Sequence, residues 1–151
     1  MSSGIVLPKE FVYPVATAVS TFYLLVWQTV KVGRARGAAK VEYPQVYAEK
    51  SEVAANQAAY AFNCTQRAHQ NTLEVLPVVL TGTLVSGLKY PIAAATLGGM
   101  WILSRVIYTI GYSTGDPKKR NMLGAGPIGA LSLMGIVGLS TASVVSLLKA
   151  L

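Results

Sequence analysis

The 151-residue sequence has very few of the residues from which metal and redox sites are built. It contains one cysteine, Cys64, and one histidine, His69. A single cysteine excludes a disulfide framework within the chain, and no paired ligand spacing indicates a zinc site. A serine, histidine and acid triad is not supported either, because His69 and Glu74 point to different faces of a helix. We therefore predict no metal, and a buried apolar role for Cys64.

Charge is also scarce. Charged residues make up 13% of the chain and hydrophobic residues 52%, whereas roughly 25% of an average soluble protein is charged. Thirteen Lys and Arg against six Asp and Glu give a formal net charge of +7. The basic residues are sparse and separated by long uncharged stretches, which argues against nucleic-acid binding. The apolar content excludes a disordered chain. The class that remains is a small integral membrane protein of one domain, residues 1–151.

Four segments are candidates to cross a bilayer, which takes about 20 mostly apolar residues in a helix. The chain is uncharged over Phe11–Val30 and Asn121–Leu148, and Pro91–Tyr112 is apolar apart from Arg105. The remaining segment is more polar, and we interpret it as one long helix that protrudes beyond the membrane. The predicted fold is all-α, an integral membrane four-helix bundle with spans at about 11–32, 53–88, 91–112 and 122–148.

Basic residues are concentrated in two of the predicted connections. The positive-inside rule therefore predicts that both connections face the cytosol and that both termini are lumenal. Basic residues near the membrane surface also attract anionic lipid headgroups. These residues are Arg34, Arg36, Lys40 and Lys50 in the first connection, and Lys118, Lys119 and Arg120 in the last.

The second and third predicted spans each carry a polar stripe. An ionisable group at the bilayer centre costs roughly 2.5–3.5 kcal/mol on insertion scales, so such groups face protein or water. Helical spacing places each set on one face, and two opposed stripes would form a polar cavity open to the cytosol. The stripes are Arg67, Asn71 and Glu74 on the second span, and Arg105, Tyr108 and Tyr112 on the third.

Such a cavity has guanidinium, hydroxyl and amide donors and one carboxylate, which suits a ligand with carboxylates and one amine. The alternative is a neutralising network of Arg67, Glu74 and Arg105 that only holds the bundle together. In either case the protein shows no nucleophile of its own, and an enzymatic reaction would need one from the substrate.

The stretch Phe62–Glu74, F-N-C-T-Q-R-A-H-Q-N-T-L-E, resembles the signature of the membrane-associated proteins in eicosanoid and glutathione metabolism, the MAPEG family. Val41–Pro44 before it, and Ser104–Val106 and Thr114–Pro117 after it, resemble the same family in order and spacing. The likeness covers about residues 11–148 and is greatest to the type 3 microsomal glutathione S-transferase subfamily.

The resemblance implies a homotrimer in the endoplasmic reticulum membrane, with the co-substrate glutathione bound between subunits near the cytosolic side. It implies glutathione contacts on both stripes and an arginine that activates the glutathione thiol. Arg120 and Arg36 are the catalytic candidates. Lys119 competes with Arg120 because the preceding segment is one residue longer than in a leukotriene synthase relative. Arg36, at the end of the first span, is the better match for a further arginine of the site, and Arg34 is the alternate. The glutathione-binding candidates are Arg67, Asn71, Glu74, Arg105, Tyr108 and Tyr112.

The expected reaction follows from the thiol. A thiol of pKa about 8.5 is only a few per cent ionised at pH 7. A guanidinium that lowers this pKa by ~2 units, about 2.7 kcal/mol, makes the thiolate the major form. The thiolate would attack a lipophilic electrophile or a lipid hydroperoxide, and leukotriene synthesis would use the same group. The alternatives are a non-catalytic lipid-binding scaffold of the same superfamily and a small transporter that uses Glu74 as its ion carrier.

Overall fold

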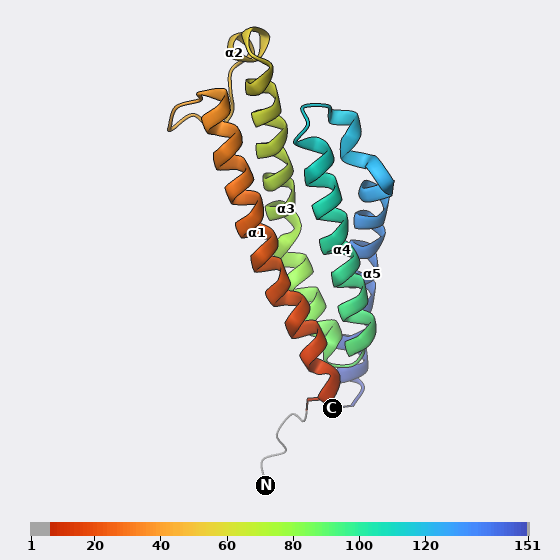
Figure 1. The fold of residues 1–151 in the computed structure, drawn as a ribbon. Coiled ribbons are helices and arrows are strands. Elements are labelled where there is room, and N and C mark those ends of the chain that lie inside the picture. The colour runs from red at the N-terminus through yellow and green to blue at the C-terminus, as the bar shows by residue number, and fades with distance from the viewer. Residues whose placement is uncertain (1–6, 151) are drawn as a thin grey trace.

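In the computed structural model, which describes residues 7–150, the chain forms helices and contains no strand over that range (Figure 1). The all-α prediction is confirmed. Three helical segments, Lys9–Ala39, Pro91–Tyr112 and Pro117–Leu148, are long and apolar enough to cross a membrane. The α-helices are α1 (Val12–Ala39), α2 (Lys50–Ala55), α3 (Gln57–Gly87), α4 (Pro91–Tyr112) and α5 (Ala125–Leu148), with 3₁₀ helices at Lys9–Phe11 (η1) and Pro117–Gly124 (η2).

The four long helices run alongside one another, and α3 contacts α1, α4 and α5. The start of α1 and the end of α5 lie at the same end of the bundle, and α2 lies at the other (Figure 1). At a rise of 1.5 Å per residue, α1 and α3 are about 42 and 46 Å long, against about 33 Å for α4. The hydrocarbon core of a bilayer is about 30 Å thick. In Figure 1 the additional length of α1 and α3 projects at the end that carries α2.

Three helix boundaries differ from the sequence prediction. The helix expected over 53–88 is two helices, because Asn56 is extended at φ −145° and its side chain accepts a hydrogen bond from the Ala58 amide to begin α3. The first helix continues to Ala39, where Lys40 ends it in the left-handed conformation. The last begins at Ala125 rather than 122, because Leu123 and Gly124 both have positive φ.

Polar side chains are buried inside the bundle together with an apolar core, and many large apolar side chains are exposed on its surface. Gln28 of α1 is fully buried, and its Nε2 donates to the hydroxyls of Thr72 in α3 at 2.9 Å and Thr109 in α4 at 2.8 Å. On the outside, Tyr23 and Met134 are 74% and 70% exposed. A water-soluble bundle shows the opposite arrangement, so this distribution is the one expected for helices surrounded by lipid.

Gly82 sets how closely α3 approaches α5. A Cβ at this position would lie 2.5 Å from Cγ2 of Ile136, a fully buried side chain of α5. Small residues allow such close approach between helices in membranes. Gly99 of α4, in contrast, has no atom within 4 Å of the equivalent position.

We predict that Gly82→Ala lowers the thermal midpoint in detergent, because an extra methyl group in a packed contact costs about 1–3 kcal/mol. Gly99→Ala is the matched control and should leave the midpoint unchanged or raise it, since alanine favours a helix over glycine by up to about 1 kcal/mol. Circular dichroism during heating measures both. Equal midpoints for the two variants would contradict the close α3–α5 contact.

Candidate functional site

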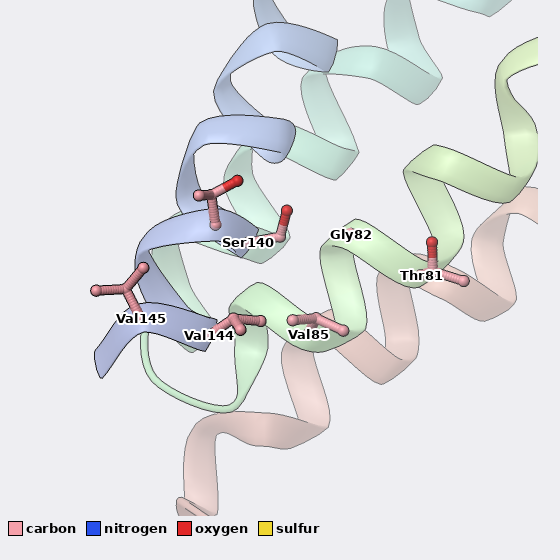
Figure 2. A pocket seen from close by; sticks show the side chains of 7 residues that line it. Thr81, Gly82, Val85, Ser140, Val144 and Val145 are labelled. Carbon is pink, nitrogen blue, oxygen red and sulfur yellow. The ribbon is translucent and has the colours of Figure 1, made fainter. Parts of the chain in front are cut away.

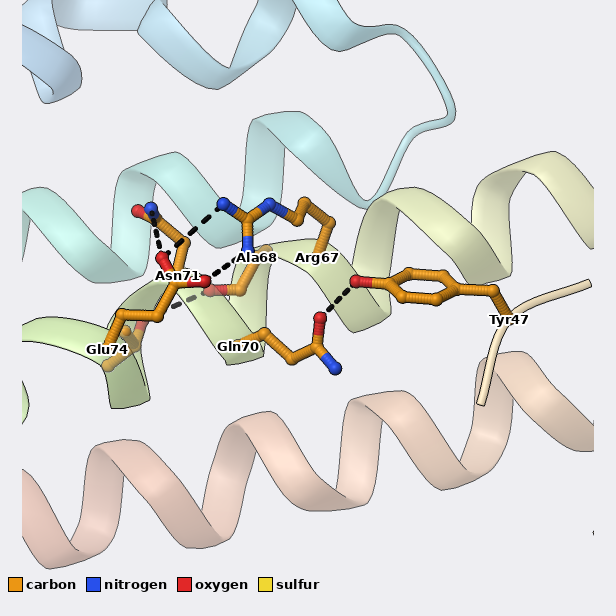
Figure 3. Close-up of polar contacts among 7 residues, drawn as sticks. Tyr47, Arg67, Ala68, Gln70, Asn71 and Glu74 are labelled. Atoms are coloured by element: carbon orange, nitrogen blue, oxygen red, sulfur yellow. Dashed lines mark hydrogen bonds and ion pairs between the residues drawn. The ribbon is translucent and has the colours of Figure 1, made fainter. Parts of the chain in front are cut away.

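Three polar residues of α3 form a hydrogen-bonded cluster, as their helical spacing predicts (Figure 3). Arg67 Nη1 and Glu74 Oε1 are 2.5 Å apart, and Arg67 Nη2 donates to Glu74 Oε2 at 3.4 Å. The Asn71 amide donates to the same Oε2 at 3.3 Å. The cluster therefore presents one guanidinium, one amide and one carboxylate side by side.

The cluster lies on the outside of the single chain. The Arg67 and Glu74 side chains are 43% and 50% exposed, and a shallow hollow of about 460 Å³ is lined by Gln70, Leu73 and Glu74. Arg67 is about 15 Å along α3 from its start, and Tyr108, near the end of α4, is within electrostatic reach of it. A charged pair on a membrane helix has to face water, a ligand or another protein surface rather than lipid.

The polar stripe of α4 continues into η2 as a row of stacked groups. The Arg105 guanidinium lies 4.0 Å from the centre of the Tyr108 ring. The Tyr108 and Tyr112 rings meet edge to face at 5.6 Å, and the Arg120 guanidinium lies 5.9 Å from the Tyr112 ring. Arg67 is within electrostatic reach of both tyrosines. The structure thus brings the α3 cluster and this row into one region.

Arg105 is the buried member of the row. It is 8% exposed, and its Nε and Nη2 have no hydrogen-bond partner among residues 7–150. A buried guanidinium without acceptors is costly. Its stacking on Tyr108 stabilises part of the charge, while these two donor nitrogens stay buried without an acceptor among residues 7–150.

Arg120 and Lys119 differ in where their side chains lie. Arg120 is partly buried, donates to the Pro117 carbonyl at 3.1 Å and faces Tyr112. The Lys119 residue is exposed, whereas its backbone carbonyl packs against Gly111. Of the two competing positions, Arg120 has its charge beside the tyrosines.

Arg36 has different neighbours from the six stripe residues. It is buried, and its Nη1 donates to the carbonyls of Val41, Glu42 and Gln45 at 3.3, 3.4 and 2.7 Å. Its contacts within the described chain hold the end of α1 to the connection that follows. Arg34, the alternate, is exposed on the same helix.

Two residues of this region were not singled out from the sequence as site residues. The Tyr47 hydroxyl hydrogen-bonds to Gln70 Oε1, next to Arg67 on α3 (Figure 3). Burial raises the pKa of the Tyr47 phenol, the Arg67 charge opposes this effect, and the Glu74 charge adds to it. Tyr47 lies in the connection between α1 and α2, where helical periodicity predicts no facing direction.

A second hollow, of about 340 Å³, lies between the ends of α3 and α5 (Figure 2). Hydroxyl and aliphatic side chains line it, without a charged group, so it offers nothing to bind a carboxylate or an ammonium. Over residues 7–150 no group of three His, Cys, Asp or Glu is placed to hold a metal. Cys64 is 3% exposed. The hollow is lined by Thr81, Gly82, Val85, Ser140, Thr141, Val144 and Val145.

Long apolar helices with exposed apolar side chains, and basic residues in the connections at the end that carries α2, are typical of an integral membrane helical protein. The sequence matches the MAPEG family over residues 14–140. It is also 32% identical over 130 residues to an uncharacterized protein of Synechocystis sp., and the aligned region covers 85% of each chain. The chain belongs to the MAPEG family, and the predicted family is confirmed. This family contains glutathione-dependent transferases and peroxidases as well as non-catalytic members.

The Tyr47 phenol supplies a test of this geometry. Because its pKa is raised above the ordinary value of about 10, the folded state holds this proton more tightly than the unfolded state. Ionisation of this phenol therefore costs no stability below about pH 10, and the folded state loses stability as the pH rises from there through the folded value. The difference in ultraviolet phenolate absorbance between wild type and Tyr47→Phe should titrate above pH ~10. A midpoint at or below that value would contradict the partly buried position.

Proposed function

We propose that this protein is a glutathione-dependent membrane enzyme that conjugates glutathione to lipophilic electrophiles, reduces lipid hydroperoxides, or does both. The observation that carries the proposal is the Arg67–Asn71–Glu74 cluster, open to the outside and beside the row of Tyr108, Tyr112 and Arg120. Glutathione has two carboxylates, one ammonium and a thiol. Arginine and amide donors suit the carboxylates, and Glu74 suits the ammonium.

The binding site of this proposal lies between subunits of a homotrimer. MAPEG proteins form trimers and bind glutathione and lipophilic substrates. In a single chain the charged cluster is half exposed on the surface of α3. The proposal counts α3 as a membrane span in addition to the three apolar helical segments. A neighbouring subunit would cover this face, and the ligand would lie between that subunit and the cluster. Arg34 and Arg36, at the end of α1, remain the two candidates for a further arginine of the site.

The chemistry proposed for Arg120 is stabilisation of the glutathione thiolate. In conjugation, the sulfur forms a bond to an electrophilic carbon while the leaving group departs with its electron pair. In peroxide reduction, the thiolate attacks one oxygen and breaks the O–O bond, which gives an alcohol and a sulfenic acid. A second glutathione then converts the sulfenic acid into a disulfide and water. Leukotriene synthesis would be conjugation to an epoxide. The lipophilic substrate would reach the site from the membrane.

The second candidate function is a non-catalytic lipid-binding scaffold, since such members occur in the family. A scaffold has no need of a guanidinium beside the tyrosines or of a carboxylate placed for an ammonium. The presence of Glu74, Arg67 and Arg120 in one region favours the enzyme. We place the basic connections on the cytosolic side, where glutathione is available, and keep the endoplasmic reticulum as the predicted membrane.

The first test is glutathione binding by calorimetry in detergent, with turnover of a model halide, an epoxide and a fatty-acid hydroperoxide. Wild type should bind, and Glu74→Gln should raise the dissociation constant at least about tenfold, the usual cost of losing a hydrogen bond to a charged group. Its thermal midpoint should change little, because the Arg67–Glu74 pair is half exposed and exposed pairs contribute little to stability.

Glu10→Gln, at the opposite end of the bundle, is the control and should bind as wild type. A large fall in the thermal midpoint of Glu74→Gln with unchanged affinity would favour the purely structural network. A wild-type protein that neither binds glutathione nor turns over any of the three substrates refutes the enzyme.

Arg120→Ala should impair chemistry more than binding. Glutathione would remain held by Arg67 and Asn71, while the thiol pKa rises and turnover at pH 7 falls, with partial recovery at high pH as the thiol ionises unaided. Thiolate absorbance against pH, measured alongside turnover, shows both effects. Lys119→Ala is the matched control, because Lys119 is the neighbouring exposed cation. If only Lys119→Ala shifts the titration, Arg120 is not the activating residue.

A further inference from the structure

The connection between α1 and α2, residues 40–49, is fastened to the end of α1 by a single buried arginine. Arg36 donates to three carbonyls of this segment, the shortest bond being 2.7 Å to Gln45. Its guanidinium also lies 4.4 Å from the Tyr43 ring and 4.6 Å from the Phe62 ring of α3. The Arg36 side chain thereby holds the connection against both α1 and α3.

A second fastening ties the same connection to α3. The Asn63 amide pairs with the backbone of Ala48 in both directions, accepting from its N–H at 2.8 Å and donating to its carbonyl at 2.9 Å. Gln45 adds a bond of 2.6 Å to Glu52 of α2. The connection therefore has a defined path across the end of the bundle, although it is not helical.

The two fastenings determine where Tyr47 lies. Tyr47 directly precedes Ala48, the residue paired with Asn63, and follows Gln45 by two positions. Its ring extends along α3, and its hydroxyl reaches Gln70 beside Arg67 (Figure 3). An aromatic side chain from a loop is thus brought to the edge of the cluster proposed to hold glutathione.

We propose that residues 40–49 form a fixed strap that makes Tyr47 a further glutathione-binding residue, with Arg36 and Asn63 as positioning residues that act through it. This inference rests on the proposed function, since the ligand is glutathione. The phenol has one proton, which it donates to Gln70 Oε1. Its oxygen still has lone pairs to accept a hydrogen bond. Glutathione supplies matching donors in its ammonium and its two peptide N–H groups.

The alternative is that Tyr47 only holds the strap to α3. The strap is already held by Arg36 and by the paired amide of Asn63. Loss of the hydroxyl should therefore leave the fold intact. The two interpretations differ in ligand affinity, because only the binding role makes affinity depend on that oxygen.

The test compares Tyr47→Phe with Tyr43→Phe by calorimetry with glutathione and by thermal unfolding without it. Tyr43 is 80% exposed in the same strap, and phenylalanine keeps its ring for stacking on Arg36. Tyr47→Phe should raise the dissociation constant about two- to tenfold, the effect of one hydrogen bond. Tyr43→Phe should bind as wild type, and all three proteins should unfold at the same temperature.

Asn63→Ala tests the positioning role. It should weaken binding by a similar factor, and combining it with Tyr47→Phe should add little, because both changes remove the same contact. If the two effects add in full, Asn63 does not act through Tyr47. Wild-type affinity in Tyr47→Phe overturns the inference and leaves the proposed function standing. The same conclusion follows if Tyr43→Phe weakens glutathione binding equally, or if Tyr47→Phe also unfolds at a lower temperature. A wild-type protein that binds no glutathione overturns both.

Discussion

Hydrocarbon offers no hydrogen-bond partners, and this constraint decides where the polar groups of the protein lie. Gln28 is buried at the centre of the bundle and ties α1 to Thr72 and Thr109 on its two neighbours. Hydroxyl groups on the outer surface return to their own helix, as Ser20 does to the Ala16 carbonyl at 2.9 Å. The charged pair of Arg67 and Glu74 cannot be satisfied in lipid, so its half-exposed position indicates a face that water, ligand or another subunit covers.

The site region depends on how closely the helices pack. At Gly111 of α4, a Cβ would collide with the Lys119 carbonyl. The absence of a side chain there allows η2 to lie against α4. That contact brings Arg120 over Tyr112 while the Lys119 side chain stays exposed. The placement of the proposed activating charge is in this way a consequence of one glycine and one short 3₁₀ helix.

Much of the fold could be predicted from the sequence. The uncharged runs, and the proline that begins α4, mark the long helices because apolar length and backbone restriction are local properties. The α3 cluster could be predicted for the same reason, since helical spacing alone brings Arg67, Asn71 and Glu74 together. The breaks at Asn56 and at Leu123 could not, because each depends on a backbone conformation of one residue within an otherwise helical pattern.

The sequence by itself determined that this is an all-α membrane protein with two polar stripes, because composition and periodicity are properties of the chain alone. Only the tertiary structure decided how the two stripes lie relative to each other. In the folded chain Arg36 donates hydrogen bonds to carbonyls of the connection rather than to stripe residues, and the Tyr47 hydroxyl donates to Gln70. The direction of a loop side chain is set by contacts with distant residues, here with Asn63 of α3. Such contacts exist only once the helices have packed.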